Sequence, residues 1–303
     1  MGTQNPAPCL YLVFIPSRIR ELPHIRLQFI TTAPWSGSSM AHTSGHTTPQ
    51  SKPAAVIVVG IGITGRIELL SSRDKVKKSP HPSANDHDRQ WMHEHIKREI
   101  AIYQRLPKKH SRFIQMVGYS PEESDHHIIF EYLPKRDLRT FLDMQPSPSR
   151  RLQLQWALDA AEAVGLVHAC DIIHSDIKPS NFLVDEHLRL RLIDFSGSSI
   201  DDQPALVVEN ARFFLPRNRQ EDQSSVLTDL FALGSTIYEI MTTQQPYEDL
   251  DEEEVEARYI HGDFPGVEGV VCGDIINKCW TQQYAAATAV YNSIEEIMRR
   301  TAI

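Results

Sequence analysis

The sequence predicts an α+β protein built from two lobes of different character. Short strand-like runs around a single helical pattern fill residues 54–132, and mostly helical patterns fill residues 136–290. No internal repeat relates the two parts. Segments of different class form separate layers of structure, and a cleft between two such lobes is a common place for a ligand.

Bulk composition narrows the class of protein. The chain has 303 residues, of which 41% are hydrophobic, and a formal net charge of −8, which argues against nucleic acid as the main partner. No stretch reaches the ~18 apolar residues that a membrane span needs. The four cysteines lack paired C-x-x-C spacing, as is typical of thiols in a reducing compartment. We therefore expect an intracellular, cytoplasmic protein; its oligomeric state stays open.

Residues 1–53 are predicted to be a disordered leader. They contain one acidic residue, Glu21, and are rich in Ser, Thr, Pro and Gly, a composition that does not build a packed core. An acid-poor mitochondrial transit peptide is one alternative. A true start at Met40, with residues 1–39 arising from an error in the gene model, is another.

In the first lobe, turn signals separate runs that predict strands at "VIVV", "RIELL", "KVKK" and "HHIIFEY". Asp88 to Leu106 has apolar residues at helical spacing. Glu99 borders the apolar face of that helix, and a carboxylate there needs a partner.

In the second lobe, a linker and a short helix precede a long helix from Arg151 to Ala169. The polar stretch "HSDIKPSN" and an alternating strand, "LRLRLIDF", come next. Three helices are expected after them, at "LTDLFALGSTIYEIMT", "DLDEEEVEARYI" and "GDIINKCW". Residues 291–303 are expected to be a tail or a helix end.

A glycine pattern opens the first lobe. Gly60, Gly62 and Gly65 form G-x-G-x-x-G, whose glycines let backbone amides approach phosphates closely. Alone the pattern is weak, because an ordinary hairpin explains it equally well. A dinucleotide-binding turn would need a helix after the last glycine, whereas "RIELL" predicts a strand.

The basic run that follows has two interpretations. Lys75, Lys77 and Lys78 can line a solvated strand edge. Alternatively, a lysine crossing to the helix would satisfy Glu99 and present its ammonium group to phosphate oxygens.

Oxygen and nitrogen ligands gather in the second lobe. Asp176, Lys178 and Asn181 lie in "HSDIKPSN", and Asp194 lies in "IDFSG" at the end of the next strand. Two carboxylates and an amide from neighbouring strand ends can converge on one point. Such hard oxygen ligands suit Mg²⁺ together with substrate phosphates.

In this order and spacing, the motifs resemble the eukaryotic protein kinase family over about residues 56–285. The residues that carry the resemblance are "GIGITGRI", "VKK", "REIAIYQRL", "IIFEYL", "HSDIKPSN", "DFS" and "DLFALGSTIYEIMTTQQPY". Lys178 is similar to serine/threonine-specific members. "DFSGSS" and "TDLFALGSTIYEIMT" resemble small, divergent fungal kinases.

The resemblance implies a bilobal fold, with a kinase domain over 54–290. It divides into an N-lobe over 54–132, a hinge over 131–136 and a C-lobe over 136–290. It also implies ATP and Mg²⁺ as cofactors, with Mn²⁺ as an alternative cation, and a protein as the substrate.

Individual roles follow from the resemblance. Asp176 would accept the proton of the substrate hydroxyl, Lys178 would neutralise charge on the transferred phosphate, and Asn181 and Asp194 would hold Mg²⁺. Lys78 would pair with Glu99 and contact phosphates, Phe130 would be the gatekeeper, and the backbones of Glu131 and Leu133 would bind adenine. Asp229 would brace the backbone at His174 and Ser175. The positions expected to contact the nucleotide are Gly60, Gly62, Gly65, Ile67, Lys78, Glu99, Phe130, Glu131 and Leu133.

The chain also departs from the family pattern. Ser175 replaces the arginine that ties the loop to a phosphorylated activation segment, so we expect activity that does not depend on that phosphate. Ser196 replaces the glycine of D-F-G, with Gly197 one place later. The A-P-E end reads "LPR" and lacks its glutamate, and the partner arginine expected after "CW" is missing too. Losing both leaves no unpaired buried charge.

Three functions remain compatible with these residues. The first is an active ATP-dependent serine/threonine protein kinase. The second is a pseudokinase that serves as a nucleotide-binding or scaffold module, which the departures favour. The third is a small-molecule phosphotransferase, which carries a similar H-x-D-x-x-x-x-N loop.

Overall fold

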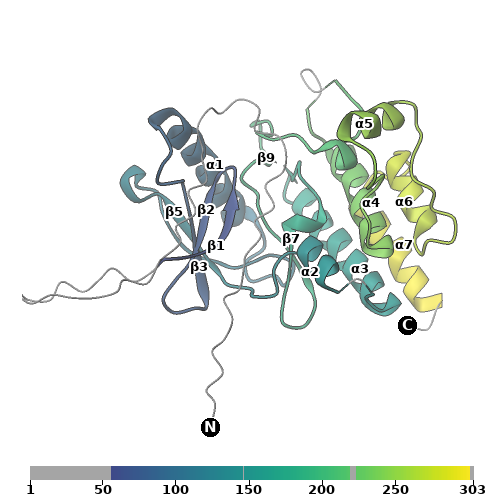
Figure 1. Cartoon of the computed structure of the whole chain (residues 1–303), viewed down its shortest axis with the longest axis horizontal. Coiled ribbons are helices and arrows are strands. Elements are labelled where there is room, and N and C mark those ends of the chain that lie inside the picture. The colour runs from purple at the N-terminus through teal and green to yellow at the C-terminus, as the bar shows by residue number, and fades with distance from the viewer. Residues whose placement is uncertain (1–55, 146, 219–222, 301–303) are drawn as a thin grey trace, which may run out of the picture. The chain divides into compact units, whose positions relative to one another are not determined.

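The computed structural model describes residues 56–145, 147–218 and 223–300, which belong to one compact unit, Ala54–Ile303. The leader expected over 1–53, the alternative start at Met40 and the last three residues lie outside the described part. Figure 1 shows the order of the elements.

The N-lobe is a five-stranded antiparallel sheet with one α-helix, and the sequence predicts the helix and four of the five strands. Its strands run in the spatial order β1-β2-β3-β5-β4, and the helix α1 lies beside the sheet (Figure 1). Their bounds are β1 Ile57–Gly62, β2 Gly65–Leu69, β3 Lys75–Ser79, α1 Asp86–Arg105, β4 Met116–Ser120 and β5 His127–Glu131.

Two details of this lobe differ from the expectation. Helix α1 begins two residues earlier, because the side chain of Asn85 accepts a hydrogen bond from the amide of Asp88 and so caps the helix. The edge strand β4 was not predicted. Its residues alternate between half-buried and exposed and include Gly118, so its apolar pattern is weak.

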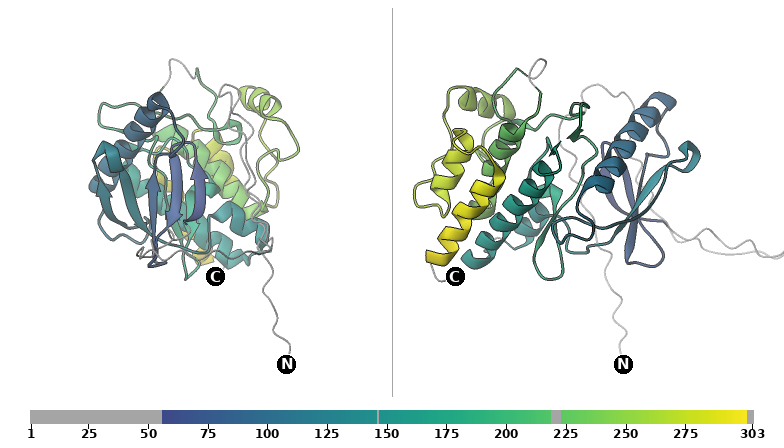
Figure 2. Two further views of the ribbon diagram at one scale, coloured as in Figure 1. Left: turned by 60° about the vertical axis from the view of Figure 1, so that its left-hand side comes forward. Right: turned by 180° about the vertical axis from the view of Figure 1, so that it is seen from behind.

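The C-lobe is mainly helical. Helix α3 packs against α4 and α7, and α4 packs against α6; Figure 2 shows α3 and α7 side by side in the right-hand view. The helices are α2 Leu138–Met144, α3 Arg150–His168, α4 Val226–Thr242, α5 Glu252–Ile260, α6 Gly273–Trp280 and α7 Ala287–Arg300. Short 3-10 helices lie at Glu123–Asp125, Pro179–Asn181 and Ala211–Phe213.

Two small antiparallel pairs in the C-lobe carry the polar motifs. Strand β6 (Ile172–Ile173) pairs with β9 (Ser199–Ile200), and β7 (Phe182–Val184) pairs with β8 (Leu190–Leu192). These pairs flank "HSDIKPSN" and the segment that begins at Asp194. The predicted α+β fold of two unlike lobes is confirmed.

Helix α7 extends beyond the expected domain end at residue 290. Val290 and Ile294 on its inner face are fully buried, and α7 packs along α3. The apolar face of the helix therefore continues past that boundary. Among the described helices, none combines the length and the apolar character that crossing a membrane would demand.

Candidate active site

The glycine pattern forms the hairpin between β1 and β2. Gly62 pairs with Gly65 at its tip, and a strand follows the last glycine, as the sequence predicts, which excludes the dinucleotide-binding turn. Gly65 is required by packing, because a Cβ there would lie 2.3 Å from the carbonyl oxygen of Ser79. A Cβ at Gly62 would meet nothing nearer than 3.8 Å, so packing within the chain does not explain that glycine.

Lysine 78 joins three elements of the two lobes. Its Nζ donates to Oε2 of Glu99 on α1 at 2.7 Å and to Oδ1 of Asp194, after β8, at 2.8 Å. Lys77 points elsewhere, to Asp125 at 2.8 Å. The lysine that reaches the helix is thus Lys78, and the predicted partner of Glu99 is confirmed.

The three charged groups Lys78, Glu99 and Asp194 shift one another's pKa values. Burial opposes ionisation of Asp194, but the Lys78 ammonium outweighs it and holds the pKa of that carboxyl well below its ordinary value. The pKa of Lys78 is raised despite burial, because two carboxylates surround the ammonium. Burial raises the pKa of Glu99 against the opposing pull of Lys78. The group therefore keeps an ionised carboxylate at Asp194 near neutral pH.

The loop "HSDIKPSN" holds Asp176 through its own side chains. Lys178 Nζ donates to Oδ1 and Oδ2 of Asp176 at 2.8 and 2.7 Å, and Asn181 Nδ2 donates to Oδ2 at 2.9 Å. The Asp176 side chain keeps 22% of its surface exposed, so a substrate can reach it. The geometry brings together a carboxylate, a cation and an amide, as the sequence predicts.

The donor set suits a divalent cation. Asn181 uses its amide nitrogen in bonds to Asp176, which leaves its amide oxygen as the atom able to coordinate metal. The amide of Ile193 donates to the carbonyl of Asn181 at 2.9 Å, so the loop is fixed next to Asp194. Carboxylate and amide oxygens are ligands that Mg²⁺ accepts.

Asp229 on α4 accepts hydrogen bonds from the backbone of this loop. Its Oδ2 and Oδ1 accept the backbone amides of His174 and Ser175 at 2.8 and 2.9 Å, which confirms the expected contact. Ser175 has a left-handed backbone, with φ of 66°, and its hydroxyl donates locally to the carbonyl of Ile173 at 3.3 Å. No long side chain projects from this position toward the activation segment.

Aromatic rings connect the loop to the N-lobe. Phe195 contacts His174 with ring centroids 4.9 Å apart and Tyr103 of α1 at 5.3 Å. Tyr103 in turn contacts Phe130 of β5 at 5.0 Å. This chain of ring contacts joins α1 to β5 and to the segment after β8, and the expected gatekeeper Phe130 is buried.

The remaining predicted positions lie along the sheet and the linker. Ile67 is on β2, opposite Lys78 in the β2–β3 register. Glu131 ends β5, and its carboxylate accepts from Arg191 at 2.9 Å. Leu133 follows in the linker between β5 and α2. Contact of Ile67 and of the backbones of Glu131 and Leu133 with a nucleotide stays a prediction.

Sequence reasoning missed the contacts that hold the activation segment, which runs from Asp194 to the "LPR" motif at Leu215 to Arg217. Arg98 donates to the carbonyls of Ser198 and Pro204 at 2.8 and 2.9 Å. Arg105 makes a bidentate pair with Asp201, with distances of 2.6 and 2.9 Å. Both arginines lie on α1, so the helix that carries Glu99 is tied to the segment. Their spacing on one helix is the only signal that the sequence offers.

The end of the segment has an ion pair of its own. Arg217, at the position of the missing A-P-E glutamate, donates to Glu209 at 2.7 Å, and Glu209 is buried. The guanidinium also lies 4.5 Å from the ring centroid of Phe214. The expected pair of the A-P-E glutamate with the arginine after "CW" is therefore absent, and an ion pair between residues eight positions apart lies here instead. The sequence alone does not reveal this pair, because no periodic spacing marks Glu209 and Arg217 as partners.

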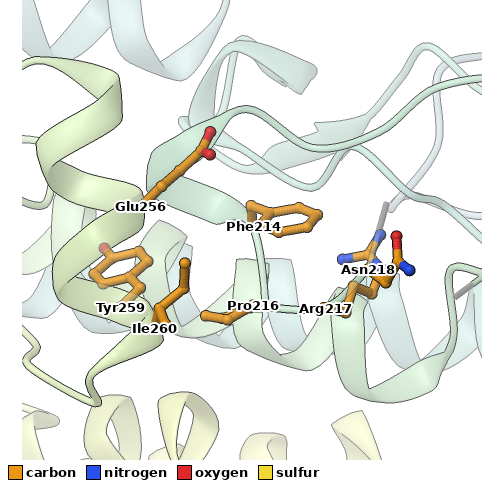
Figure 3. A pocket seen from close by; sticks show the side chains of 7 residues that line it. All are labelled: Phe214, Pro216, Arg217, Asn218, Glu256, Tyr259 and Ile260. Carbon is orange, nitrogen blue, oxygen red and sulfur yellow. The ribbon is translucent and has the colours of Figure 1, made fainter. Parts of the chain in front are cut away.

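A separate pocket of about 210 Å³ lies at this end of the segment. Figure 3 shows its lining, which comes from the segment end and from α5: Phe214, Pro216, Arg217, Asn218, Glu256, Tyr259 and Ile260. None of the residues predicted to bind ATP or metal lines it, so it does not belong to the site built around Lys78 and Asp176.

Comparison with known proteins identifies the class. The protein kinase domain family matches residues 56–298, and the chain belongs to that family. It is similar to "Serine/threonine-protein kinase 12" of Arabidopsis thaliana, with 26% identity over 200 residues, 63% of this chain and 39% of that protein.

It is also similar to "Probable serine/threonine-protein kinase drkA" of Dictyostelium discoideum, with 30% identity over 202 residues, 62% of this chain and 30% of that protein. "Putative L-type lectin-domain containing receptor kinase V.2" of Arabidopsis thaliana is 30% identical over 192 residues, 60% of this chain and 28% of that protein. The matches span between about a quarter and two fifths of these relatives. The narrower resemblance to small fungal kinases stays a prediction.

Proposed function

We propose that this chain is an active ATP-dependent serine/threonine kinase whose activity does not require a phosphorylated activation segment. The observation that carries the proposal is the pairing of Lys78 with both Glu99 and Asp194. A lysine that bonds both to α1 of the N-lobe and to the segment after β8 supports a site already arranged for nucleotide. The names of the relatives support serine/threonine specificity.

The chemistry assigns each residue a task. Asp176 accepts the proton of a substrate hydroxyl, and the oxygen of that hydroxyl bonds to the γ-phosphorus of ATP. At the same time the bond between the γ-phosphorus and the oxygen that bridges it to the β-phosphate breaks, and ADP leaves. Lys178, held on Asp176, is placed to neutralise charge on the transferred group. Lys78 positions the α- and β-phosphates. A Mg²⁺ ion held by Asn181 and Asp194, for which Mn²⁺ is an alternative, would offset phosphate charge.

Activity is tested by phosphate transfer from radiolabelled ATP to casein or a basic protein. A positioned base contributes roughly 10²–10⁴ in rate, so transfer should fall at least a hundredfold in Asp176→Ala. Lys78→Met should lose transfer, while Lys77→Met, its neighbour on the opposite face of β3, should keep it. Equal transfer by wild type and Asp176→Ala would refute the proposal. Thermal stabilisation by Mg²⁺-ATP without transfer would instead support a pseudokinase.

Independence from phosphate has its own support. Ser175 replaces the receiving arginine, and residues 200–223 contain no serine, threonine or tyrosine. Asp201 already supplies a carboxylate to Arg105, and charge-assisted bidentate pairs are the strong ones among hydrogen bonds.

Phosphatase treatment should therefore leave the rate of transfer unchanged. Removal of any phosphate is followed by mass spectrometry, and a phosphate-dependent kinase serves as the positive control. A fall in rate of tenfold or more after treatment would contradict phosphate-independent activity while leaving the kinase assignment intact.

A further inference from the structure

Ser196 stands where the family pattern has a glycine, and its side chain makes a specific contact. The residue is 3% exposed. Its hydroxyl donates to Oδ1 of Asp194 at 2.8 Å. A glycine could not make this bond, so the substitution adds a donor to the carboxylate rather than merely a side chain.

The bond from Ser196 gives one carboxylate oxygen of Asp194 a second hydrogen-bond donor. Oδ1 of Asp194 accepts from both Lys78 and Ser196, and the Asp194 side chain retains 40% exposure. Two donors on Oδ1 restrict rotation of the carboxylate. They leave Oδ2 as the oxygen that can turn to a cation.

The turn that carries Ser196 is itself fixed. The amide of Ser198 donates to the carbonyl of Phe195 at 3.2 Å, and the hydroxyl of Ser198 donates to the carbonyl of His174 at 2.9 Å. A Cβ on Gly197 would lie 2.3 Å from a methyl of Val207, so the chain passes close to its neighbour there. Ser196 is thus held in a packed turn, and its hydroxyl stays directed at Asp194.

We propose that Ser196 is a positioning residue, which orients the Asp194 carboxylate for the divalent cation that accompanies ATP. The inference rests on the proposed function, because it takes Asp194 as a metal ligand. In this arrangement the hydroxyl of Ser196 and the ammonium of Lys78 together fix the orientation of the carboxylate.

The test measures cation affinity and not only transfer. Mn²⁺ is titrated into the full chain with a non-hydrolysable ATP analogue, and free Mn²⁺ is followed by electron paramagnetic resonance. Ser196→Ala and Ser196→Gly should each weaken Mn²⁺ binding by about ten- to a hundredfold, the size expected for losing one hydrogen bond to a charged group. Ser199→Ala removes a hydroxyl from β9, three residues further along the same segment, and its Mn²⁺ affinity should match that of wild type.

Each outcome is decisive. Wild-type affinity in Ser196→Ala, with loss confined to Ser196→Gly, would assign the effect to backbone freedom and overturn the inference. If Ser196→Ala does not fold, the isosteric pair Ser196→Thr and Ser196→Val replaces it, and equal affinities in that pair would overturn the inference too. No Mn²⁺ binding by wild type would overturn the proposed function itself.

Discussion

At the scale of single residues, Lys78 and Glu99 are buried in the site as an ion pair, whereas the buried His126 has no hydrogen-bond partner among the described residues. Glu99 and Lys78 satisfy each other inside the protein, and removing one member of such a pair typically costs about 3–5 kcal/mol. In contrast, neither ring nitrogen of the buried His126 has a hydrogen-bond partner within the described residues. Its ring packs edge-on against His93, with centroids 4.8 Å apart.

This environment makes stability depend on pH. Burial, reinforced by His93 and Lys97, lowers the pKa of His126 to about 4. The unfolded chain takes up a proton near pH 6.5, but the folded chain resists it down to about pH 4, so folding stability falls as the pH drops through that window. His126→Phe should remove this loss and gain roughly 1–2 kcal/mol relative to wild type at pH 5.

Denaturant unfolding at pH 7.5 and pH 5.0 checks the prediction. At pH 7.5 the histidine is neutral in both states, so that measurement isolates the packing effect of the phenylalanine. An equal drop in stability for wild type and His126→Phe between the two pH values would show that His126 does not titrate on unfolding.

At the scale of elements, two glycines inside helices differ in the space around them. One lies where two helices pack closely, and the other lies where a side chain would fit. Gly234 lies inside α4, where a Cβ would come within 2.6 Å of the Cβ of Cys279 on α6. Gly165 lies inside α3, where a Cβ would find its nearest neighbour, a methyl of Thr288, at an ordinary 3.6 Å. The first glycine sets the approach of two helices, and the second does not.

Substitution by alanine should therefore have opposite effects at the two sites. Gly234→Ala should destabilise the protein by about 1–3 kcal/mol, because two packed helices must move apart. Gly165→Ala should stabilise it by roughly 0.5–1 kcal/mol, since alanine is the better helix former.

The free energy of unfolding, measured with denaturant on both variants and wild type, checks this pair. Since the chemical change is identical, the difference between the variants reports the local space alone. Equal effects in the two variants would mean that α6 yields without cost and that Gly234 has no packing role.

At the scale of the whole molecule, the contacts between the lobes converge on α1 and on the segment after β8. Lys78 bonds to Asp194, and Arg98 and Arg105 hold the backbone and side chains beyond it. A further backbone contact lies outside these elements, where the amide of Leu192 on β8 donates to the carbonyl of Arg112 at 2.8 Å. The segment that carries Asp194 is therefore tied to the helix that carries Glu99.

The sequence by itself determined most of the fold and the candidate residues of the site. Periodicity placed strands and helices in two unlike lobes, and the order of short motifs identified Lys78, Glu99, Asp176, Asn181 and Asp194 as candidates. These inferences succeed because local spacing encodes which face of an element is buried. The weakly apolar edge strand β4 and the full length of α7 escaped the same reasoning.

Only the tertiary structure decided the partners. Whether Lys77 or Lys78 meets Glu99, that Ser196 donates to Asp194, and that Arg217 finds Glu209 depend on which segments fold against each other. From the sequence alone, a charged side chain or a hydroxyl could bond either to solvent or to a residue far away in the chain. Burial removes the solvent alternative, and folding then fixes the partner that remains.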